Sequence, residues 1–169
     1  MRIKHYDKFL KEGYNLVVDT QEKDRVLSGK LIYTATGKEV PIIDSIPRFI
    51  SEEENYSKNF GLQWNKYKTT QLDSNSGLTI SNDRVWDNSK WNKENLNGKT
   101  ILEVGSGAGR FTEVLLASGA TVVSFDMSSA VDANFANNKD KGDLFLIQAS
   151  IYNLPLKAVS YTHLTLPTT

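Results

Sequence analysis

The chain contains no cysteine among its 169 residues. This absence excludes disulfide bridges, zinc sites built from thiolates and cysteine nucleophiles, and we expect no bound metal. Only two histidines, His5 and His163, are present to supply imidazole chemistry. His5 has no evident partner in the sequence, so the catalytic residues are unknown at this stage.

A charge excess of either sign is also missing, because 20 basic and 20 acidic side chains cancel. The Lys and Arg residues are scattered, so the basic footprint of a nucleic-acid partner is absent. No apolar run approaches the roughly 20 residues that a membrane span needs, and the N-terminus lacks the apolar core of a signal peptide. We therefore expect a cytoplasmic protein without a membrane span. Nothing in the composition indicates its oligomeric state.

A glycine-rich block carries most of the functional information. Residues 100–109 read Thr-Ile-Leu-Glu-Val-Gly-Ser-Gly-Ala-Gly. The apolar residues before Gly105 predict a buried strand, and the spacing of apolar residues from Arg110 onward predicts a helix. Between them, Gly105, Gly107 and Gly109 make a loop with almost no side chains. Such a loop lets a ligand lie against bare backbone at the N-terminus of a helix.

Two more apolar runs follow, at residues 121–125 and 144–148, with a helix predicted from about Ala130. Alternating strands and helices with short turns predict a parallel sheet with right-handed crossovers, which binds ligands beyond the carboxyl ends of its strands. Asp126 ends the second strand, where a carboxylate can accept hydrogen bonds from both hydroxyls of a ribose. The predicted fold class is α/β, an incomplete Rossmann-like parallel sheet preceded by a small β-rich module.

The acid at Glu103, the G-x-G-x-G spacing and the later Asp126 together resemble the cofactor site of class I S-adenosylmethionine-dependent methyltransferases of the type 11 group. The resemblance implies S-adenosyl-L-methionine as cofactor, with its methionine part against the glycine loop, its ribose at Asp126 and its adenine beside Met127. Where the family often has an acid near the adenine, this chain has Ser150, whose hydroxyl can also accept a hydrogen bond. The implied cofactor-binding residues are Glu103, Gly105, Gly107, Gly109, Asp126, Met127, Ala149, Ser150 and Ile151.

Residues 1–50 predict a small β-rich module, with short strands near 16–18, 31–33 and 40–43. The run Val40-Pro41-Ile42-Ile43-Asp44-Ser45-Ile46-Pro47-Arg48-Phe49 resembles the ending of a zinc-ribbon-like module that precedes many bacterial methyltransferase domains. That module binds zinc through paired cysteines. Because this chain has none, we expect a degenerate version that holds together by packing alone.

Residues 51–99 predict a helical, aromatic linker. The segments 59–65 and 71–74 resemble a stretch of the same two-part proteins, and we expect one or two helices that cap the cofactor pocket. Four aromatic residues either line a substrate cleft or pack onto the main domain: Trp64, Tyr67, Trp86 and Trp91.

Residues 100–158 then correspond to the N-terminal part of a methyltransferase domain, whereas residues 159–169 do not continue its pattern. Back-translated, Val159 to Thr168 resembles a transposase-type sequencing adapter, so we expect a non-native tail on a C-terminally truncated domain. The alternative is a genuine β-rich tail. The family continues with a fourth strand at this point, so truncation would leave unpaired the sheet edge against which that strand pairs. It would also place His163 outside the native sequence.

The expected function is transfer of a methyl group from S-adenosyl-L-methionine to a small-molecule or saccharide acceptor. We expect the chain as it stands to be inactive and to bind the cofactor weakly at best. Two alternatives remain open. An NAD(P)-dependent oxidoreductase or epimerase would have a third glycine where Arg110 stands and a Tyr-x-x-x-Lys pair, whereas Tyr161 is followed by Thr165. In a non-catalytic binding module, the glycine loop would be merely structural.

Overall fold

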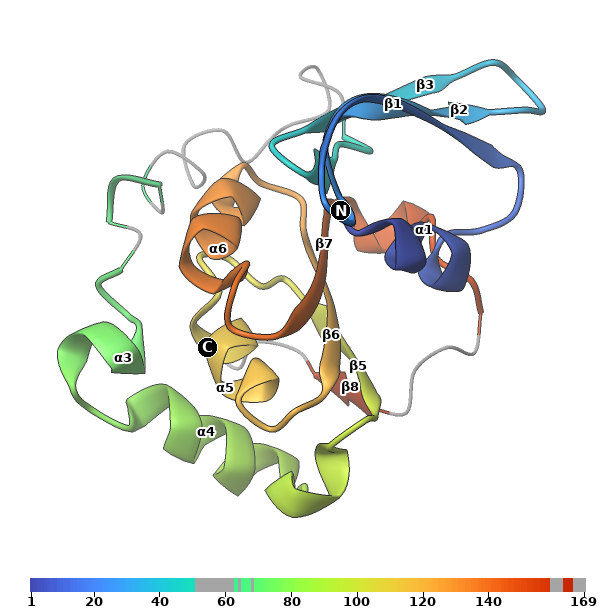
Figure 1. The fold of residues 1–169 in the computed structure, drawn as a ribbon. Coiled ribbons are helices and arrows are strands. Elements are labelled where there is room, and N and C mark those ends of the chain that lie inside the picture. The colour runs from blue at the N-terminus through green and yellow to red at the C-terminus, as the bar shows by residue number, and fades with distance from the viewer. Residues whose placement is uncertain (51–62, 64, 68, 159–162, 166–169) are drawn as a thin grey trace.

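The computed structural model describes residues 1–50, 63, 65–67, 69–158 and 163–165, the last three by their backbone alone. The described chain contains two sheets (Figure 1), which an isolated bridge between Arg48 and Gln148 connects. Trp64 and most of the segment 59–65 lie outside the described residues, as does Tyr161.

The N-terminal module begins with a helix, α1 (Ile3–Phe9), followed by an antiparallel four-stranded sheet of order β1-β2-β3-β4. The three predicted strands are present as parts of longer ones. The helix was not predicted. Its seven residues are too few for a clear helical period, and it is held by tertiary packing, because Phe9 is fully buried. The strands are β1 (Tyr14–Glu22), β2 (Arg25–Tyr33), β3 (Glu39–Ile43) and β4 (Ile46–Pro47).

The second sheet confirms the predicted parallel α/β architecture. Its three long strands pair in parallel in the order β7-β6-β5, with helices in the crossovers. Figure 1 shows α5 and α6 on one side of this sheet and α1 on the other. The elements are β5 (Thr100–Val104), α5 (Arg110–Leu116), β6 (Thr121–Asp126), α6 (Ala130–Asn138) and β7 (Asp143–Gln148).

The outer edge of β5 is paired, contrary to the expectation that it lies open. A short strand, β8 (His163–Thr165), runs parallel to β5 and pairs with residues 101–103. Ladder hydrogen bonds are made by backbone groups, so any extended segment that reaches the edge can satisfy them. The tail residues therefore occupy the position in which a fourth strand was expected.

The alternation of side chains along each strand divides the core between the two faces of the parallel sheet. On one face, Val123, Phe125, Phe145 and Ile147 pack with residues of α1 and of the N-terminal sheet. On the other face, apolar residues of the same strands pack with α4, α5 and α6. The module is therefore not a separate body, because it covers one face of the parallel sheet.

The linker forms α3 (Asp73–Ser76), α4 (Ile80–Ser89) and the 3-10 turn η1 (Lys93–Leu96), and α4 packs along α5 (Figure 1). Trp86 and Trp91 pack against the core on the helical face of the sheet. Of the two alternatives for the aromatic residues, a substrate cleft or packing onto the main domain, these two residues follow the second. Tyr67 is exposed.

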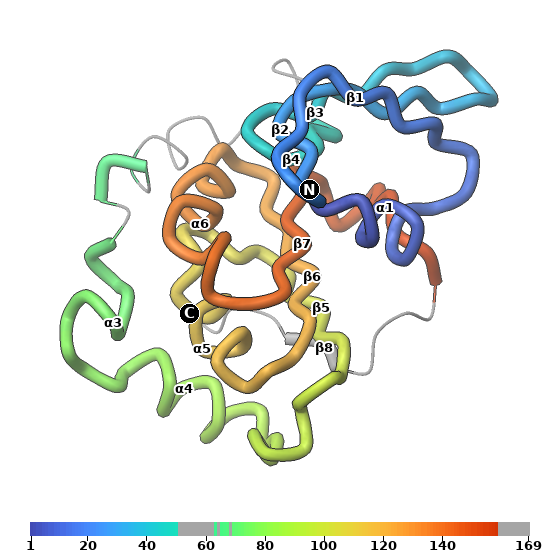
Figure 2. The backbone as a smooth tube through the Cα atoms, viewed as in Figure 1, coloured from blue at the N-terminus to red at the C-terminus, as the bar shows by residue number. Residues whose placement is uncertain are grey.

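The module contacts β7 at both ends of that strand, and Figure 2 shows β4 close to it. At the amino end, His5 Nε2 lies 2.9 Å from Asp143 Oδ1. At the carboxyl end, Arg48 pairs with Gln148 in a parallel bridge, and the Phe49 amide donates to the Gln148 carbonyl at 2.8 Å. At Gln148, the module thereby satisfies a backbone carbonyl on the outer edge of β7.

Candidate functional site

The loop after β5 requires glycine. Gly105, Gly107 and Gly109 all have positive φ, at 71°, 52° and 87°, a region that residues with a Cβ rarely adopt. A Cβ on Gly109 would also lie 2.2 Å from Asn134 Oδ1. The loop is therefore fixed by conformation and by close packing, and its bare backbone faces the carboxyl end of the sheet.

The same loop is bonded to the end of β6. The amides of Gly105 and Ser106 donate to the Phe125 carbonyl at 2.9 and 3.2 Å. The Gly107 amide donates to Asp126 Oδ2 at 2.9 Å. The structure thus brings together the glycine loop and the carboxylate that the sequence predicted as partners.

Asp126 is also bonded to the turn that follows β6. Its Oδ1 accepts hydrogen bonds from the Ser128 amide at 2.8 Å and the Ser128 hydroxyl at 2.7 Å. The Ser128 hydroxyl in turn accepts from the amide of Ala130, the first residue of α6, at 3.2 Å. Asp126 is partly exposed, and three donors leave room on a carboxylate for a further one.

Glu103 lies beneath the glycine loop and is 1% exposed. Burial raises its pKa to about 7, and the charge of Asp126 adds to this effect, whereas the hydroxyls of Thr112 and of the nearby Ser124 lower it. Its Oε2 accepts from the Thr112 hydroxyl at 2.6 Å. Its Oε1 is buried and has no hydrogen-bond partner among the described residues.

Two buried asparagines of α6 hold the helical end of the loop, and the sequence analysis missed both. Asn138 Nδ2 donates to the Gly109 carbonyl and to Asn134 Oδ1, each at 2.9 Å. Asn134 Nδ2 donates to the Thr112 hydroxyl at 2.9 Å. Both asparagines are fully buried. Their i, i+4 spacing on a helix was the only available signal, because it places them on one face.

The remaining predicted cofactor residues lie at the ends of β6 and β7. Met127 is 36% exposed, and its carbonyl accepts from Gln148 Nε2 at 3.0 Å. Ala149 is buried, and its amide donates to the Asp126 carbonyl at 3.0 Å. Ser150 accepts from the Tyr152 amide at 3.3 Å as the cap of the 3-10 turn η2 (Ile151–Asn153), and Ile151 is exposed.

The described histidine side chain, that of His5, is not placed in this site. His5 is buried at the amino end of β7, the opposite end of the strand from Gln148. The side chain of His163 is not among those described. Over the described parts of the chain, no three His, Asp or Glu side chains gather as a metal site would require. None of the described helices is long and apolar enough to cross a membrane.

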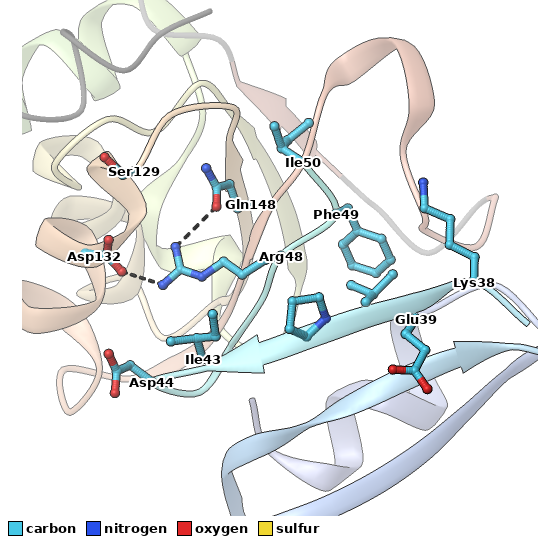
Figure 3. A pocket seen from close by; sticks show the side chains of 12 residues that line it. Lys38, Glu39, Ile43, Asp44, Arg48, Phe49, Ile50, Ser129, Asp132 and Gln148 are labelled. Atoms are coloured by element: carbon cyan, nitrogen blue, oxygen red, sulfur yellow. Dashed lines mark hydrogen bonds and ion pairs between the residues drawn. The ribbon is translucent and has the colours of Figure 1, made fainter. Parts of the chain in front are cut away.

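A cavity of about 570 Å³ opens beside the carboxyl end of β7, between β3 and the start of α6 (Figure 3). Its lining includes Arg48, Phe49, Ser129, Asp132 and Gln148. It is adjacent to the residues that are expected to surround an adenine.

Comparison with protein families gives a match over residues 102–167 to the family model described as "Methyltransferase domain". This segment contains the glycine loop and Asp126. No curated protein matches the chain.

Among solved structures, the chain is similar to a proposed S-adenosyl-L-methionine-dependent methyltransferase from Methanococcus maripaludis, with a TM-score of 0.50 and 15% identity. The match covers 69% of this chain and 53% of that one, so the chain spans about half the length of that relative. The architecture is therefore that of the class I methyltransferase fold.

Two further structures are similar at a TM-score of 0.41. One is protein arginine methyltransferase 10 of Arabidopsis thaliana, at 21% identity, covering 57% of this chain and 27% of that one. The other is phosphoethanolamine N-methyltransferase 1 of Haemonchus contortus in complex with phosphoethanolamine and S-adenosylhomocysteine, at 24% identity, covering 62% and 23%.

Proposed function

We propose that this chain is the cofactor-binding part of an S-adenosyl-L-methionine-dependent methyltransferase that acts on a small-molecule or saccharide acceptor. The observation that carries the proposal is the bond between the Gly107 amide and Asp126, because it sets a ribose-binding carboxylate beside bare backbone. The methyltransferase family match covers both residues. In this proposal the cofactor lies across the carboxyl ends of β5 and β6.

The polar groups of the site fit the two ends of the cofactor. Glu103 Oε1 is a buried acceptor without a partner in the described chain, and the cationic amino group of the cofactor, directly or through a water, would satisfy it. Asp126 would hold the ribose. A ribose that uses both hydroxyls displaces one of the present donors, because the carboxylate already accepts three hydrogen bonds.

The nucleoside end would lie between Met127 and the turn that begins at Ala149. Met127 offers a partly exposed apolar side chain, which suits the flat face of an adenine. Ser150 can accept a hydrogen bond from the adenine amino group only in addition to the one from Tyr152, because its oxygen is the cap of the following turn.

S-adenosyl-L-methionine, when bound, supplies a methyl group that its sulfonium charge has already activated. The residues of this chain hold the cofactor and fix its orientation, so that an acceptor can approach in line. We assign no base to the reaction. The balanced charge of the chain disfavours a nucleic acid.

The proposal is tested by titrating the ¹⁵N-labelled chain with S-adenosylhomocysteine and, separately, with NADH, while amide shifts are followed by NMR, which also detects weak binding. We expect saturable shifts at the three loop glycines with S-adenosylhomocysteine alone. Asp126→Asn should weaken this binding about tenfold or more, because a charged hydrogen-bond acceptor is lost. Asp87→Asn, which changes an exposed carboxylate on α4, is the matched control.

The alternatives give other results. Saturable binding of NADH without binding of S-adenosylhomocysteine would support the oxidoreductase. Binding of neither compound would support a non-catalytic module in which the glycine loop has only a structural role.

A further inference from the structure

Arg48 directly follows β4 in the chain. Its side chain points toward Asp132 and Gln148 of the parallel domain (Figure 3). The residue belongs to the Ile-Pro-Arg-Phe run that closes the module. Its side chain is 11% exposed and forms an ion pair with Asp132 on α6. Its second contact is a hydrogen bond from Nη1 to Gln148 Oε1, at 3.3 Å.

Gln148 connects Arg48 to the nucleoside end of the site through hydrogen bonds of its side-chain amide. It is the last residue of β7 and is 6% exposed. Its Oε1 accepts from Arg48, and its Nε2 donates to the Met127 carbonyl at 3.0 Å. A guanidinium can only donate, so Arg48 fixes which end of the amide faces it. The other end must then face Met127 and donate to its carbonyl.

The Met127 carbonyl belongs to the turn that carries the nucleoside-binding residues. Asp126 precedes it, and the Ser128 amide donates to the Asp126 carboxylate. The turn is also bonded to the end of β7, because the Ala149 amide donates to the Asp126 carbonyl at 3.0 Å. A continuous series of hydrogen bonds therefore runs from Arg48 through Gln148 to the turn after β6.

We propose that Arg48 is a positioning residue for the nucleoside half of the cofactor, acting through the Gln148 amide on the backbone of Met127. The inference rests on the proposed function and adds a role for the N-terminal module. Without Arg48, Gln148 Oε1 is buried with no cation to face, and the amide loses its fixed orientation. The Met127 carbonyl then loses its donor, and the turn around Asp126 is no longer held in one conformation.

Four variants separate this role from simple docking of the module. Arg48→Met and Gln148→Met each break the series of hydrogen bonds. Asp132→Asn weakens the ion pair of Arg48 and leaves its contact with Gln148. Lys38→Met is the matched control. Lys38 lines the same cavity, but its side chain is exposed and has no ion-pair partner among the residues that the structure describes.

The first readout is affinity, measured by NMR titration with S-adenosylhomocysteine and with 5′-methylthioadenosine, which lacks the amino-acid end. We expect Arg48→Met and Gln148→Met to weaken the binding of both compounds by the same factor. The factor is about tenfold, which corresponds to the loss of about one buried hydrogen bond. The affinities of Lys38→Met and Asp132→Asn for both compounds should stay within about threefold of those of the unmodified chain. Equal weakening by Asp132→Asn and Arg48→Met would reduce Arg48 to a docking contact and overturn the proposal.

The second readout needs no ligand. Hydrogen exchange of the Ser128 and Ala149 amides should become about tenfold faster in Arg48→Met, while exchange in β5 and in the Lys38→Met control is unchanged. Unchanged exchange at both amides would contradict the inference. If the unmodified chain binds no S-adenosylhomocysteine, the proposed function fails, and the exchange measurement still decides whether Arg48 holds this turn.

Discussion

The Gly107 amide and the Asp126 carboxylate are joined by a hydrogen bond of 2.9 Å, across the carboxyl ends of two neighbouring parallel strands. The acid expected to hold a ribose therefore also holds the loop expected to hold the rest of the ligand. A ligand hydroxyl that donates to Asp126 in place of the Gly107 amide changes the restraints on the loop. Binding and loop conformation are consequently coupled at this contact.

The close packing behind the loop predicts a large effect of Gly109→Ala. A Cβ at this position meets Asn134 Oδ1 at 2.2 Å and Asn138 Nδ2 at 2.3 Å, in addition to the strain of φ = 87°. We expect the free energy of unfolding to fall by about 3 kcal/mol or more, combining left-handed strain with overpacking. Chemical denaturation measures this change.

Gly98→Ala is the matched control for that experiment. Gly98 has a similar φ of 73°, but a Cβ there meets no atom within 4 Å. Gly98→Ala should lower the free energy of unfolding by only about 1 kcal/mol, because it adds backbone strain without a steric clash. Equal losses in the two variants would show that the contacts with the asparagines do not restrain the loop.

The raised pKa of Glu103 predicts a stability that decreases with pH. In the folded protein the Glu103 carboxyl stays protonated up to a pH of about 7. In the unfolded chain it loses its proton near its ordinary pKa of 4.5. Between these values the folded state binds more protons, so the free energy of unfolding falls as pH rises. The fall is about 3 kcal/mol over the whole interval.

Glu103→Gln removes this titration and keeps an acceptor for Thr112. We expect its stability relative to the unmodified chain to increase between pH 5 and about pH 7 and then to level off. Denaturation curves of the two proteins, taken in parallel across this range, measure the difference. A difference that does not vary with pH would mean that Glu103 is ionised in the folded protein throughout.

The attachment of α1 predicts the opposite pH dependence at Asp143. The hydrogen bond from His5 holds the pKa of Asp143 well below its ordinary range, and contacts with Lys4 and Thr121 add to this effect, whereas burial opposes it. Burial lowers the pKa of His5, and its Nδ1 has no hydrogen-bond partner in the described chain. We therefore take His5 as neutral, with Nε2–H donating to Asp143.

A carboxylate with a lowered pKa stabilises the fold above its ordinary pKa, and this contribution is lost as pH falls through the folded value. Asp143→Asn should therefore cost about 2 kcal/mol at pH 7, and the cost should shrink below about pH 4. Asp140→Asn, at an exposed site on the turn that precedes β7, should change stability little. A cost for Asp143→Asn that persists unchanged in acid would show that the carboxylate charge does not matter.

The sequence predicted the parallel sheet and the glycine loop because both depend on local signals. The strands are continuous apolar runs, and the three loop glycines all need positive φ. The position of Asp126 followed from the rule that parallel strands end at one edge. These features can be read without knowing which distant segments meet.

The supporting contacts were not predicted because they join segments that are far apart in the chain. Arg48 meets Gln148 only after the module has docked on β7, and Asn138 meets the Gly109 carbonyl only after α6 has packed beside the loop. The helix α1 was missed for the same reason, since its Phe9 is buried against Phe145 of β7. No local pattern marks a partner that tertiary packing supplies.

The central claim is that the backbone after β5 and the carboxylate of Asp126 hold one nucleoside. The most direct test is a crystal structure of this chain with S-adenosylhomocysteine. We predict that the ribose hydroxyls lie within hydrogen-bond distance of Asp126, with the amino-acid end at Gly105 and Gly107 and the adenine beside Met127. A nucleoside bound instead in the cavity beside Phe49, with its ribose away from Asp126, would contradict this account.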